Sequence, residues 1–386
     1  MTTDISRRGL IGLGVGAAIL PAISVAQATK EKNRVGFAIV GLGKLSLDQL
    51  IPAFRNARSA RLAALVTGHP EKAHGIAEEH RLPSSAIYTY ADFDRIASDP
   101  AIEVVYIVLP NFMHAEYTIR ALKAGKHVLC EKPMATTIGD AEKMIAAARQ
   151  ANRHLMIAYR CHYEPLNLAA MRLLRSAKLG KARLVVTDMG RQADPDDPSD
   201  AWRLDMMKSG GGALTDMGIY GVNGARYLLN EEPIEVQAWS QTDKTDPRFR
   251  EVVDSYSWQF RFPSGAIGVG STSFNYAATM SWRVLSERGK MTADPGCFYS
   301  GNRLTVAGAA TPQIREIDQF AREMDWMAEV VRGRAPMVST AEEGLQDMRL
   351  MEAIMESAAR GGATVATRSD FHRSVDPAAV VDMVSA

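Results

Sequence analysis

Cysteine is scarce in this sequence, since Cys130, Cys161 and Cys297 are the three cysteines among 386 residues. An odd and widely spaced set excludes a disulfide framework and has no metal-ligand spacing, so we expect no metal site and three buried, small apolar side chains. An excess of charge of either sign is also missing, because the formal net charge is +1. That balance gives no electrostatic footprint for nucleic acid or an anionic membrane, and small molecules are the expected ligands.

The composition is that of a globular protein with a sizeable core. Apolar residues make up 46% of the chain and charged residues 23%, values typical of globular domains. A length of 386 residues exceeds the usual size of one domain, so we expect two domains joined by a short linker.

The first 28 residues have the pattern of an export signal. A twin arginine, Arg7-Arg8, precedes an uncharged, glycine-rich run over residues 9–26, and an A-x-A cleavage site ends at Ala28. A twin arginine before such a run indicates export by the Tat machinery, which carries folded proteins, so we expect a periplasmic protein whose mature chain begins near Thr29. The alternatives are a membrane anchor and a disordered basic tail; the glycines and a proline in the run argue against a stable membrane helix.

The stretch over residues 35–54 predicts a strand, a tight turn and a helix. Its apolar run ends at two glycines, Gly41 and Gly43, after which the apolar spacing becomes helical. Such a turn lets a dinucleotide pyrophosphate approach the helix N-terminus, although Ser46 replaces the third glycine of the usual motif and an ordinary glycine turn is the alternative. The residues expected to contact the pyrophosphate are Gly41, Leu42, Gly43, Lys44 and Leu45.

The remaining patterns predict an α/β protein with two domains. Strands alternate with helices over residues 29–159, which indicates a doubly wound parallel sheet that binds a dinucleotide. Over residues 160–386 we expect an α+β domain with an open, mostly antiparallel sheet for substrate binding and oligomerisation. Its strands are predicted at residues 183–189, 235–242, 254–262, 266–274, 282–287, 290–293 and 303–307. Ligands should bind between the domains, outside the carboxyl ends of the parallel strands.

The residues after the second strand indicate which cofactor is used. Where NAD enzymes place an acidic residue on the ribose, this chain has Thr67-Gly68-His69, with Lys72 one turn later. A hydroxyl and a cation suit a 2′-phosphate, so NADP is favoured. The alternative is that Thr67 is an ordinary N-cap and Lys72 a solvated charge.

A possible acid/base group follows the strand over residues 127–130. Lys132 lies at the carboxyl end of that strand, and Asp216 and Tyr220 have a spacing that places both on one helical face. An ammonium group close to Tyr220 would lower the phenol pKa and make a pair that can take a hydroxyl proton. The alternatives are that Lys132 is a surface charge, that Tyr220 caps a core and that Asp216 pairs with an arginine.

Several motifs together resemble the Gfo/Idh/MocA oxidoreductase family. They are AIVGLGKLSLDQLIPAF (38–54), LPNFMHAEY (109–117), EKPMA (131–135), AYRCHYEPLN (158–167), GGGALTDMGIYGVNGARYLL (210–229) and the C-terminal EEGLQDMRLMEAI. Most members have histidine where this chain has Tyr220, and tyrosine there resembles the glucose-fructose oxidoreductase branch.

The resemblance implies a role for each matching residue. Lys132 and Tyr220 would form the acid/base pair, and Asp216 and Arg160 would contact the sugar. Lys132-Pro133 would be a cis peptide that aims the lysine at the nicotinamide. The cofactor contacts implied, besides the glycine turn, are Thr67, Lys72, Pro110, Asn111, His114, Glu131 and Lys132.

The resemblance also implies a reaction. One aldose would be oxidised at C1 to a lactone, and a second sugar, fructose or another aldose, would be reduced to an alditol while NADP(H) stays bound, in a homo-oligomer formed through the second-domain sheet. This chain departs from the branch in having only residues 29–34 where relatives carry a long arm over a neighbour's cofactor. The alternatives are an aldose 1-dehydrogenase with exchangeable NADP and a non-catalytic sugar-binding protein.

Overall fold

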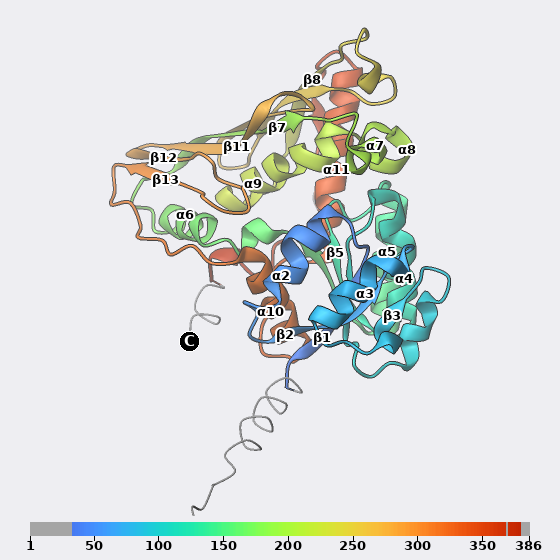
Figure 1. The fold of residues 1–386 in the computed structure, drawn as a ribbon. Helices are drawn as coiled ribbons and strands as arrows, with labels where there is room; N and C mark the ends of the chain where they lie inside the picture. The colour runs from blue at the N-terminus through green and yellow to red at the C-terminus, as the bar shows by residue number, and fades with distance from the viewer. Residues whose placement is uncertain (1–32, 368–369, 380–386) are drawn as a thin grey trace, which may run out of the picture.

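The computed structural model describes residues 33–367 and 370–379, which form two lobes, each built on one sheet (Figure 1). The predicted export signal, residues 1–28, lies outside the described residues. Among the helices that the structure describes, none has the length and apolar character needed to cross a membrane.

The first lobe alternates strands with helices. Its elements are β1 (Val35–Val40), η1 (Ser46–Leu50), α2 (Ile51–Ala53), β2 (Ala60–Val66), α3 (Pro70–Glu79), η2 (Ser84–Ala86), β3 (Ile87–Tyr88), η3 (Phe93–Ser98), β4 (Val104–Ile107), α4 (Asn111–Lys123), β5 (His127–Glu131), α5 (Ile138–Ala151) and β6 (Leu155–Ala158). The six strands are parallel in the order β3-β2-β1-β4-β5-β6. This is the doubly wound order, and the predicted sheet is confirmed; β1 and β4 flank the point at which dinucleotides bind in such sheets.

The rest of the described chain follows β6, and most of it forms the second lobe. Its elements are η4 (Arg160–His162), α6 (Pro165–Arg175), β7 (Ala182–Gln192), α7 (Pro198–Ala201), η5 (Trp202–Leu204), α8 (Met206–Ser209), η6 (Leu214–Gly218), α9 (Ile219–Leu229), β8 (Glu235–Gln241), η7 (Pro247–Phe249), β9 (Ser255–Arg261), β10 (Ile267–Ser273), β11 (Asn275–Ser286), β12 (Gly289–Ala293), β13 (Leu304–Ala307), α10 (Gln319–Val331), α11 (Ala341–Ala359) and β14 (Val365–Ala366).

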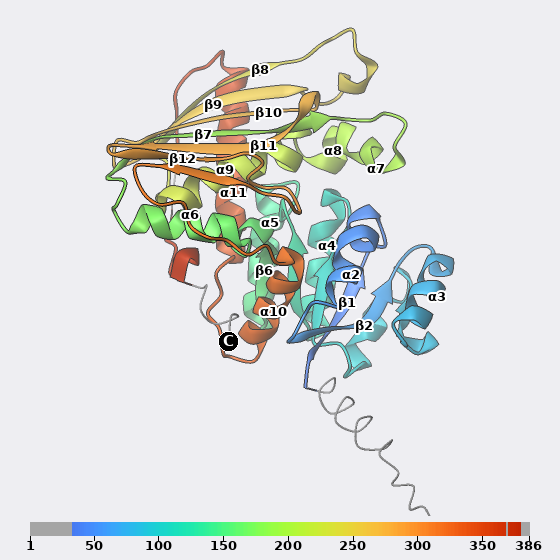
Figure 2. The same cartoon turned by 60° about the vertical axis from the view of Figure 1, so that its left-hand side comes forward.

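The second sheet has eight strands in the order β13-β12-β11-β7-β10-β9-β8-β14. All its pairs are antiparallel except β7 with β10, so the mostly antiparallel sheet is confirmed. Helices α6 and α9 lie between this sheet and the first lobe, as Figure 2 shows. The sequence prediction for β11 started at residue 282, whereas the strand begins at Asn275. The two-residue strands β3 and β14 were not predicted, because two residues carry no periodicity.

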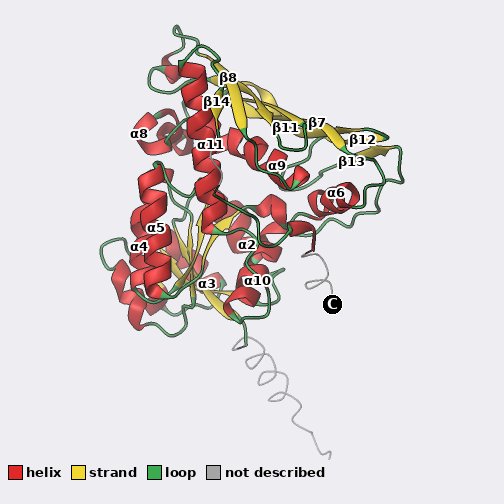
Figure 3. Ribbon diagram, turned by 180° about the vertical axis from the view of Figure 1, so that it is seen from behind, coloured by secondary structure: helices red, strands yellow, loops and turns green. Residues whose placement is uncertain are grey.

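Two late helices tie the lobes together. Helix α10 returns to the first lobe, where the Asp325 carboxylate accepts hydrogen bonds from the backbone amides of Arg58, Ser59 and Ala60 at the start of β2. Helix α11 runs beside both sheets (Figure 3). It approaches β6 closely at Gly344, where a Cβ would lie 2.9 Å from the Ile157 side chain. The two lobes are therefore held together by helices from the last part of the described chain.

Candidate active site

The glycine turn has the shape that a dinucleotide requires. Gly41 has a φ of 98°, and a Cβ there would lie 2.2 Å from the carbonyl oxygen of Val108, so only glycine fits. A Cβ at Gly43 would meet no atom within 4 Å, which leaves open space beside the backbone. Ser46 is buried and its hydroxyl donates to the Gly41 carbonyl oxygen at 2.6 Å. The serine that breaks the glycine motif thus stabilises the turn.

The other residues of the turn differ in exposure. Leu42 is buried and Leu45 is half-buried, whereas Lys44 projects into solvent with its Nζ 3.7 Å from the Asp197 carboxylate of the second lobe. This contact places the segment before α7 next to the turn. The turn therefore offers its backbone to a pyrophosphate, and Lys44 is available at its rim.

At the end of β2, the Thr67 hydroxyl accepts a hydrogen bond from the His69 amide at 3.1 Å. The N-cap of α3 is His69 rather than Thr67, so the ordinary N-cap interpretation of Thr67 is wrong. Lys72 is exposed in the first turn of α3. Glu71 lies beside it and contacts His69, 3.2 Å from the imidazole Nδ1, so a carboxylate also lies near the position predicted for a 2′-phosphate.

Two of the residues after β4, Asn111 and His114, are buried and connect neighbouring segments of the chain. Asn111 is buried, and its side-chain amide donates to the Ser209 carbonyl oxygen at 2.8 Å, which joins α4 to α8. His114 is fully buried, with its ring nitrogens 2.8 Å from the carbonyl oxygens of Leu109 and Pro133. Burial lowers the pKa of His114 to about 4, so the ring is neutral at neutral pH. It joins the loop at Pro110 to the loop after β5, and a contact with the cofactor stays a prediction.

Lys132 lies at the carboxyl end of β5, where the fold places its ligands. The Lys132-Pro133 peptide is cis, as the resemblance implied. The ammonium group donates to the backbone carbonyl oxygen of Asp216 at 2.7 Å and lies 3.6 Å from the Asp216 carboxylate. It also lies 4.7 Å from the centre of the Tyr220 ring. Residues 132, 216 and 220, distant in sequence, therefore meet as predicted.

Asp216 is surrounded by positive charge. Its carboxylate accepts from Arg203 at 3.1 Å and from Arg191 at 3.4 Å, in addition to the contact with Lys132. Burial alone would raise the pKa of Asp216, but the charges of Arg203, Lys132 and Arg191 hold it well below its ordinary value. Asp200 pairs with the same two arginines. Asp216 is thus a fixed anion that locates Lys132.

Tyr220 lies between two cations. Its hydroxyl oxygen is 3.3 Å from the Nε of Arg160, which donates to it, and the guanidinium lies 4.8 Å from the ring centre. Burial raises the pKa of Tyr220 above its ordinary value, and the charge of Arg160 opposes that rise. The expectation that a neighbouring ammonium makes Tyr220 a tyrosinate is therefore wrong for this structure, because burial outweighs the nearby charges.

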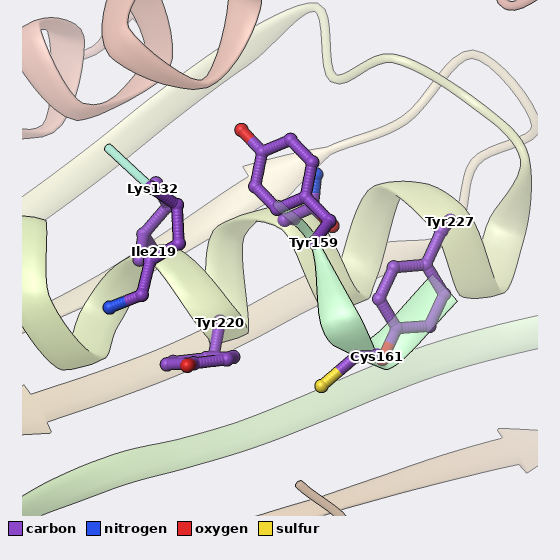
Figure 4. Close-up of a pocket in the computed structure, with 7 residues that line it drawn as sticks. Lys132, Tyr159, Cys161, Ile219, Tyr220 and Tyr227 are labelled. Atoms are coloured by element: carbon purple, nitrogen blue, oxygen red, sulfur yellow. The ribbon is translucent and has the colours of Figure 1, made fainter. Parts of the chain in front are cut away.

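A small cavity adjoins this cluster, as Figure 4 shows. Its volume is about 10 Å³, room for one water molecule. The residues around it are Lys132, Tyr159, Cys161, Ile219, Tyr220, Asn223 and Tyr227. Lys132 and Tyr220 project toward each other, so the cavity lies beside the two groups expected to move a proton.

The carboxylate of Glu131 contacts the buried Tyr106. The Tyr106 hydroxyl lies 2.9 Å from the Glu131 carboxylate and 3.2 Å from that of Glu323 on α10. One hydroxyl proton cannot serve two carboxylates, so the second contact requires a protonated carboxyl. Burial raises the pKa of Glu323 well above its ordinary value, which makes Glu323 that group. Glu131 is thereby oriented beside Lys132.

The sequence did not reveal the arginines that bind Asp216. Arg191 is the next-to-last residue of β7 and Arg203 lies in η5, and neither has a spacing that links it to Asp216. The three cysteines are buried and free, as expected. Cys161 nevertheless lines the cavity, a position that only the fold could show.

Comparison with known proteins places this geometry in a family. Residues 35–159 match the oxidoreductase family with an NAD-binding Rossmann fold, and residues 167–292 match the GFO/IDH/MocA C-terminal domain. An aldose-aldose oxidoreductase from Caulobacter crescentus, solved with glycerol, is similar with a TM-score of 0.82 and 40% identity over 86% of this chain and 99% of that chain.

Two curated relatives extend the comparison. D-xylose 1-dehydrogenase (NADP(+)) of Haloarcula marismortui is 31% identical over 86% of this chain and 93% of its own length. The 1,5-anhydro-D-fructose reductase of Ensifer adhaerens is 25% identical over 86% of this chain and 98% of its own length. With both of its lobes matched and its lysine, aspartate and tyrosine assembled after β5, the chain belongs to the Gfo/Idh/MocA oxidoreductase family.

Proposed function

We propose that the protein is an NADP-dependent sugar oxidoreductase that oxidises an aldose at C1 to an aldonolactone and reduces a second sugar to an alditol. The observation that carries this proposal is the convergence of Lys132, Asp216 and Tyr220 at the carboxyl end of β5. The similarity to an aldose-aldose oxidoreductase at 40% identity over most of both chains supports the substrate class.

The residues present fit a nicotinamide dinucleotide. Gly41 and Gly43 leave the backbone of the turn open to a pyrophosphate, and Thr67 and Lys72 are the proposed contacts of a 2′-phosphate. Glu131 precedes Lys132 in the chain, and Asn111 follows β4, so both come from the carboxyl ends of β5 and β4, the strands that follow β1 in the sheet order. When bound there, the nicotinamide accepts and returns a hydride.

The side chains of this protein divide the remaining work. Tyr220 exchanges a proton with the sugar hydroxyl, and Lys132 places a positive charge next to it. Asp216 binds Arg191, Arg203 and Lys132, so it fixes the ammonium group and reaches the sugar only from this constrained position. The raised pKa of Tyr220 keeps the phenol protonated, as proton donation to the carbonyl of the second sugar requires. In the oxidation of the first sugar the tyrosinate takes the C1 hydroxyl proton, so the phenol proton must leave before that step.

A second candidate is an aldose 1-dehydrogenase with exchangeable NADP. The observation in its favour is the 31% identity to an NADP(+)-dependent D-xylose 1-dehydrogenase. The two candidates share the chemistry at C1 and differ in whether the reduced cofactor leaves. A non-catalytic sugar-binding protein is the third, and the assembled acid/base group argues against it.

One experiment separates the three. The purified protein is denatured and its supernatant assayed for NADP; the native protein is then incubated with two sugars and no added cofactor. Equimolar lactone and alditol support retained NADP(H). Turnover only with supplied NADP supports the dehydrogenase, and no turnover under either condition supports the binding protein.

Location and assembly form part of the proposal. The twin arginine and the cleavage site at Ala28 support export by the Tat machinery after the cofactor has bound. Attachment of the first 28 residues to a reporter that is active only after Tat export tests this. The open face of the second sheet supports a homo-oligomer, which sedimentation of the mature chain would measure.

A further inference from the structure

Arg160 is a buried cation with no carboxylate within ion-pair distance among the described residues, although Glu131 and Glu323 interact electrostatically with it from farther away. Its residue is 4% exposed, yet no carboxylate in the described part of the chain forms an ion pair with it. Buried arginines are almost always paired, because an isolated charge in a protein interior is costly. The structure tolerates the cost here, next to the proposed proton-transfer group.

Neutral groups hold the guanidinium in one orientation. It donates to the Cys297 carbonyl oxygen at 2.5 Å, to the Gln319 side-chain oxygen at 2.8 Å and to the Phe298 carbonyl oxygen at 3.4 Å. It also lies 4.7 Å from the centre of the Tyr299 ring. These contacts fix the plane of the guanidinium without neutralising its charge.

The Nε of Arg160 donates to the hydroxyl oxygen of Tyr220 at 3.3 Å. Because a guanidinium has donors and no acceptor, Tyr220 must accept in this hydrogen bond. Its own proton is then directed away from Arg160. We propose that Arg160 is a positioning residue that orients the Tyr220 proton toward the cleft and stabilises the tyrosinate formed when that proton leaves; this rests on the proposed function and assigns the stabilising charge to Arg160.

Other charged groups around Tyr220 are less well placed for this role. The Lys132 ammonium lies over the face of the ring and donates to the Asp216 backbone. Glu131 and the Cys161 thiol also face Tyr220, and negative charge on either would oppose a tyrosinate. The phenol of Tyr299 is neutral at neutral pH, since burial raises its pKa. Among the described residues, Arg160 makes the hydrogen bond to the phenol oxygen.

The test compares the pH dependence of aldose oxidation in the wild type with that of Arg160→Met and Arg160→Lys. Loss of the charge should raise the pH at which activity rises by about one to three units, so kcat/KM at neutral pH should fall roughly ten- to a thousandfold. KM for the sugar should change little. Arg160→Lys should restore part of the shift, because it keeps a cation but not the fixed fork of donors.

Gln319→Leu keeps the test decisive if Arg160→Met does not fold, and a double variant extends the test where Arg160→Met does fold. Gln319→Leu removes one anchor of the guanidinium without touching Tyr220, and it should shift the profile in the same direction by less. Adding Arg160→Met to Tyr220→Phe should cost little further residual rate. An unchanged profile with a raised sugar KM would overturn the proposal and make Arg160 a sugar ligand only.

The proposal can fail separately from the proposed function. If the wild type turns over no sugar, the ionisation of Tyr220 is followed by ultraviolet difference absorption between each protein and its Tyr220→Phe counterpart. A higher titration midpoint without Arg160 supports the inference, and an equal midpoint overturns it, whatever the substrate is.

Discussion

Two buried arginines in this protein have opposite surroundings. Arg226, on α9, pairs with Asp347 and makes two hydrogen bonds to Glu232, at 2.7 and 3.0 Å. Arg160, one wall of the cleft, contacts neutral oxygens and a phenol. The charge of a buried arginine that has fixed anionic partners is already balanced within the fold. The unpaired guanidinium is free to respond when charge develops on a neighbouring group.

The two arginines belong to adjoining polar clusters. Around Arg226, Asn223 donates to Asp347 at 2.9 Å and to Glu343 at 3.2 Å, and Arg373 pairs with Glu343 at 2.7 Å. Asn223 also lines the small cavity next to Tyr220. The cluster of paired charges around Arg226 therefore adjoins the site of Tyr220 and Arg160 through Asn223.

The largest expected effect on turnover is that of a substitution at Tyr220, next to the unpaired Arg160. Tyr220→Phe removes the group that exchanges the proton, and we expect turnover to fall by at least roughly a hundredfold to ten-thousandfold, the usual contribution of acid/base catalysis. Bound NADP and the unfolding midpoint should stay close to wild type. Quantification of lactone and of released NADP measures both.

Tyr163→Phe is the matched control for that variant. Its hydroxyl is buried against Ser339, away from the cleft, so the control should keep its rate. Loss of cofactor from Tyr220→Phe would contradict the assignment and make the tyrosine structural.

The second expected effect separates the two arginines by stability. Arg226→Met leaves Asp347 and Glu232 without their cation, and we expect the free energy of unfolding to fall by about 3–5 kcal/mol, as for other broken buried pairs. Arg160→Met strands only neutral acceptors and should cost clearly less. Urea unfolding of both variants measures the difference, and equal losses would remove the distinction between the two clusters.

Much of the fold could be predicted from the sequence because the patterns that indicate its strands and helices are local. The nearly continuous apolar run over residues 101–109, AIEVVYIVL, predicts a strand buried on both faces of a parallel sheet, and β4 lies within it between two parallel neighbours. The sequence also predicts a helix at about 138–151, and α5 has these bounds, with Thr137 as its N-cap and Asn152 as its C-cap. The return of α10 to the first lobe was not readable, because it depends on Asp325 meeting three amides near residue 59.

The site was readable only in part. The spacing of Asp216 and Tyr220 predicted that both lie on one helical face. The position of Lys132 at the carboxyl end of a strand predicted that it belongs to the site. Arg203 gave no signal, since a single arginine in a polar loop has no period. The state of Tyr220 was also beyond the sequence, because its pKa depends on burial, which depends on packing.

The third expected effect is a pH dependence within the paired cluster. Burial raises the pKa of Asp347 from 3.8 to about 6, with Arg226 opposing and Glu343 adding to the rise. The folded protein therefore binds this proton more tightly than the unfolded chain, so the stability from Asp347 is full below pH 3.8 and is lost as pH rises through about 6.

Asp347→Asn should remove that loss. As the pH rises from 3.8 to about 6, the free energy of unfolding of Asp347→Asn should increase relative to that of the wild type by up to about 1.4 kcal/mol per pH unit. His162, whose pKa burial lowers to about 4, contributes the opposite slope and is present in both proteins. Urea unfolding at several pH values measures the slope, and parallel curves for the two proteins would contradict the shift.

The smallest expected effect concerns an exposed cation. Lys72 lies in solvent at the first turn of α3, so its charge is screened, unlike that of either buried arginine. Lys72→Ala should lower the preference for NADP over NAD by about fivefold, the scale of an exposed ionic contact, and leave stability unchanged. Glu71→Gln is the matched control, because it removes the neighbouring carboxylate and should shift the preference toward NADP. Titration of the apoprotein with both cofactors measures the ratio; if Lys72→Ala leaves it unchanged, the 2′-phosphate is bound elsewhere, with Thr67 as the remaining predicted contact.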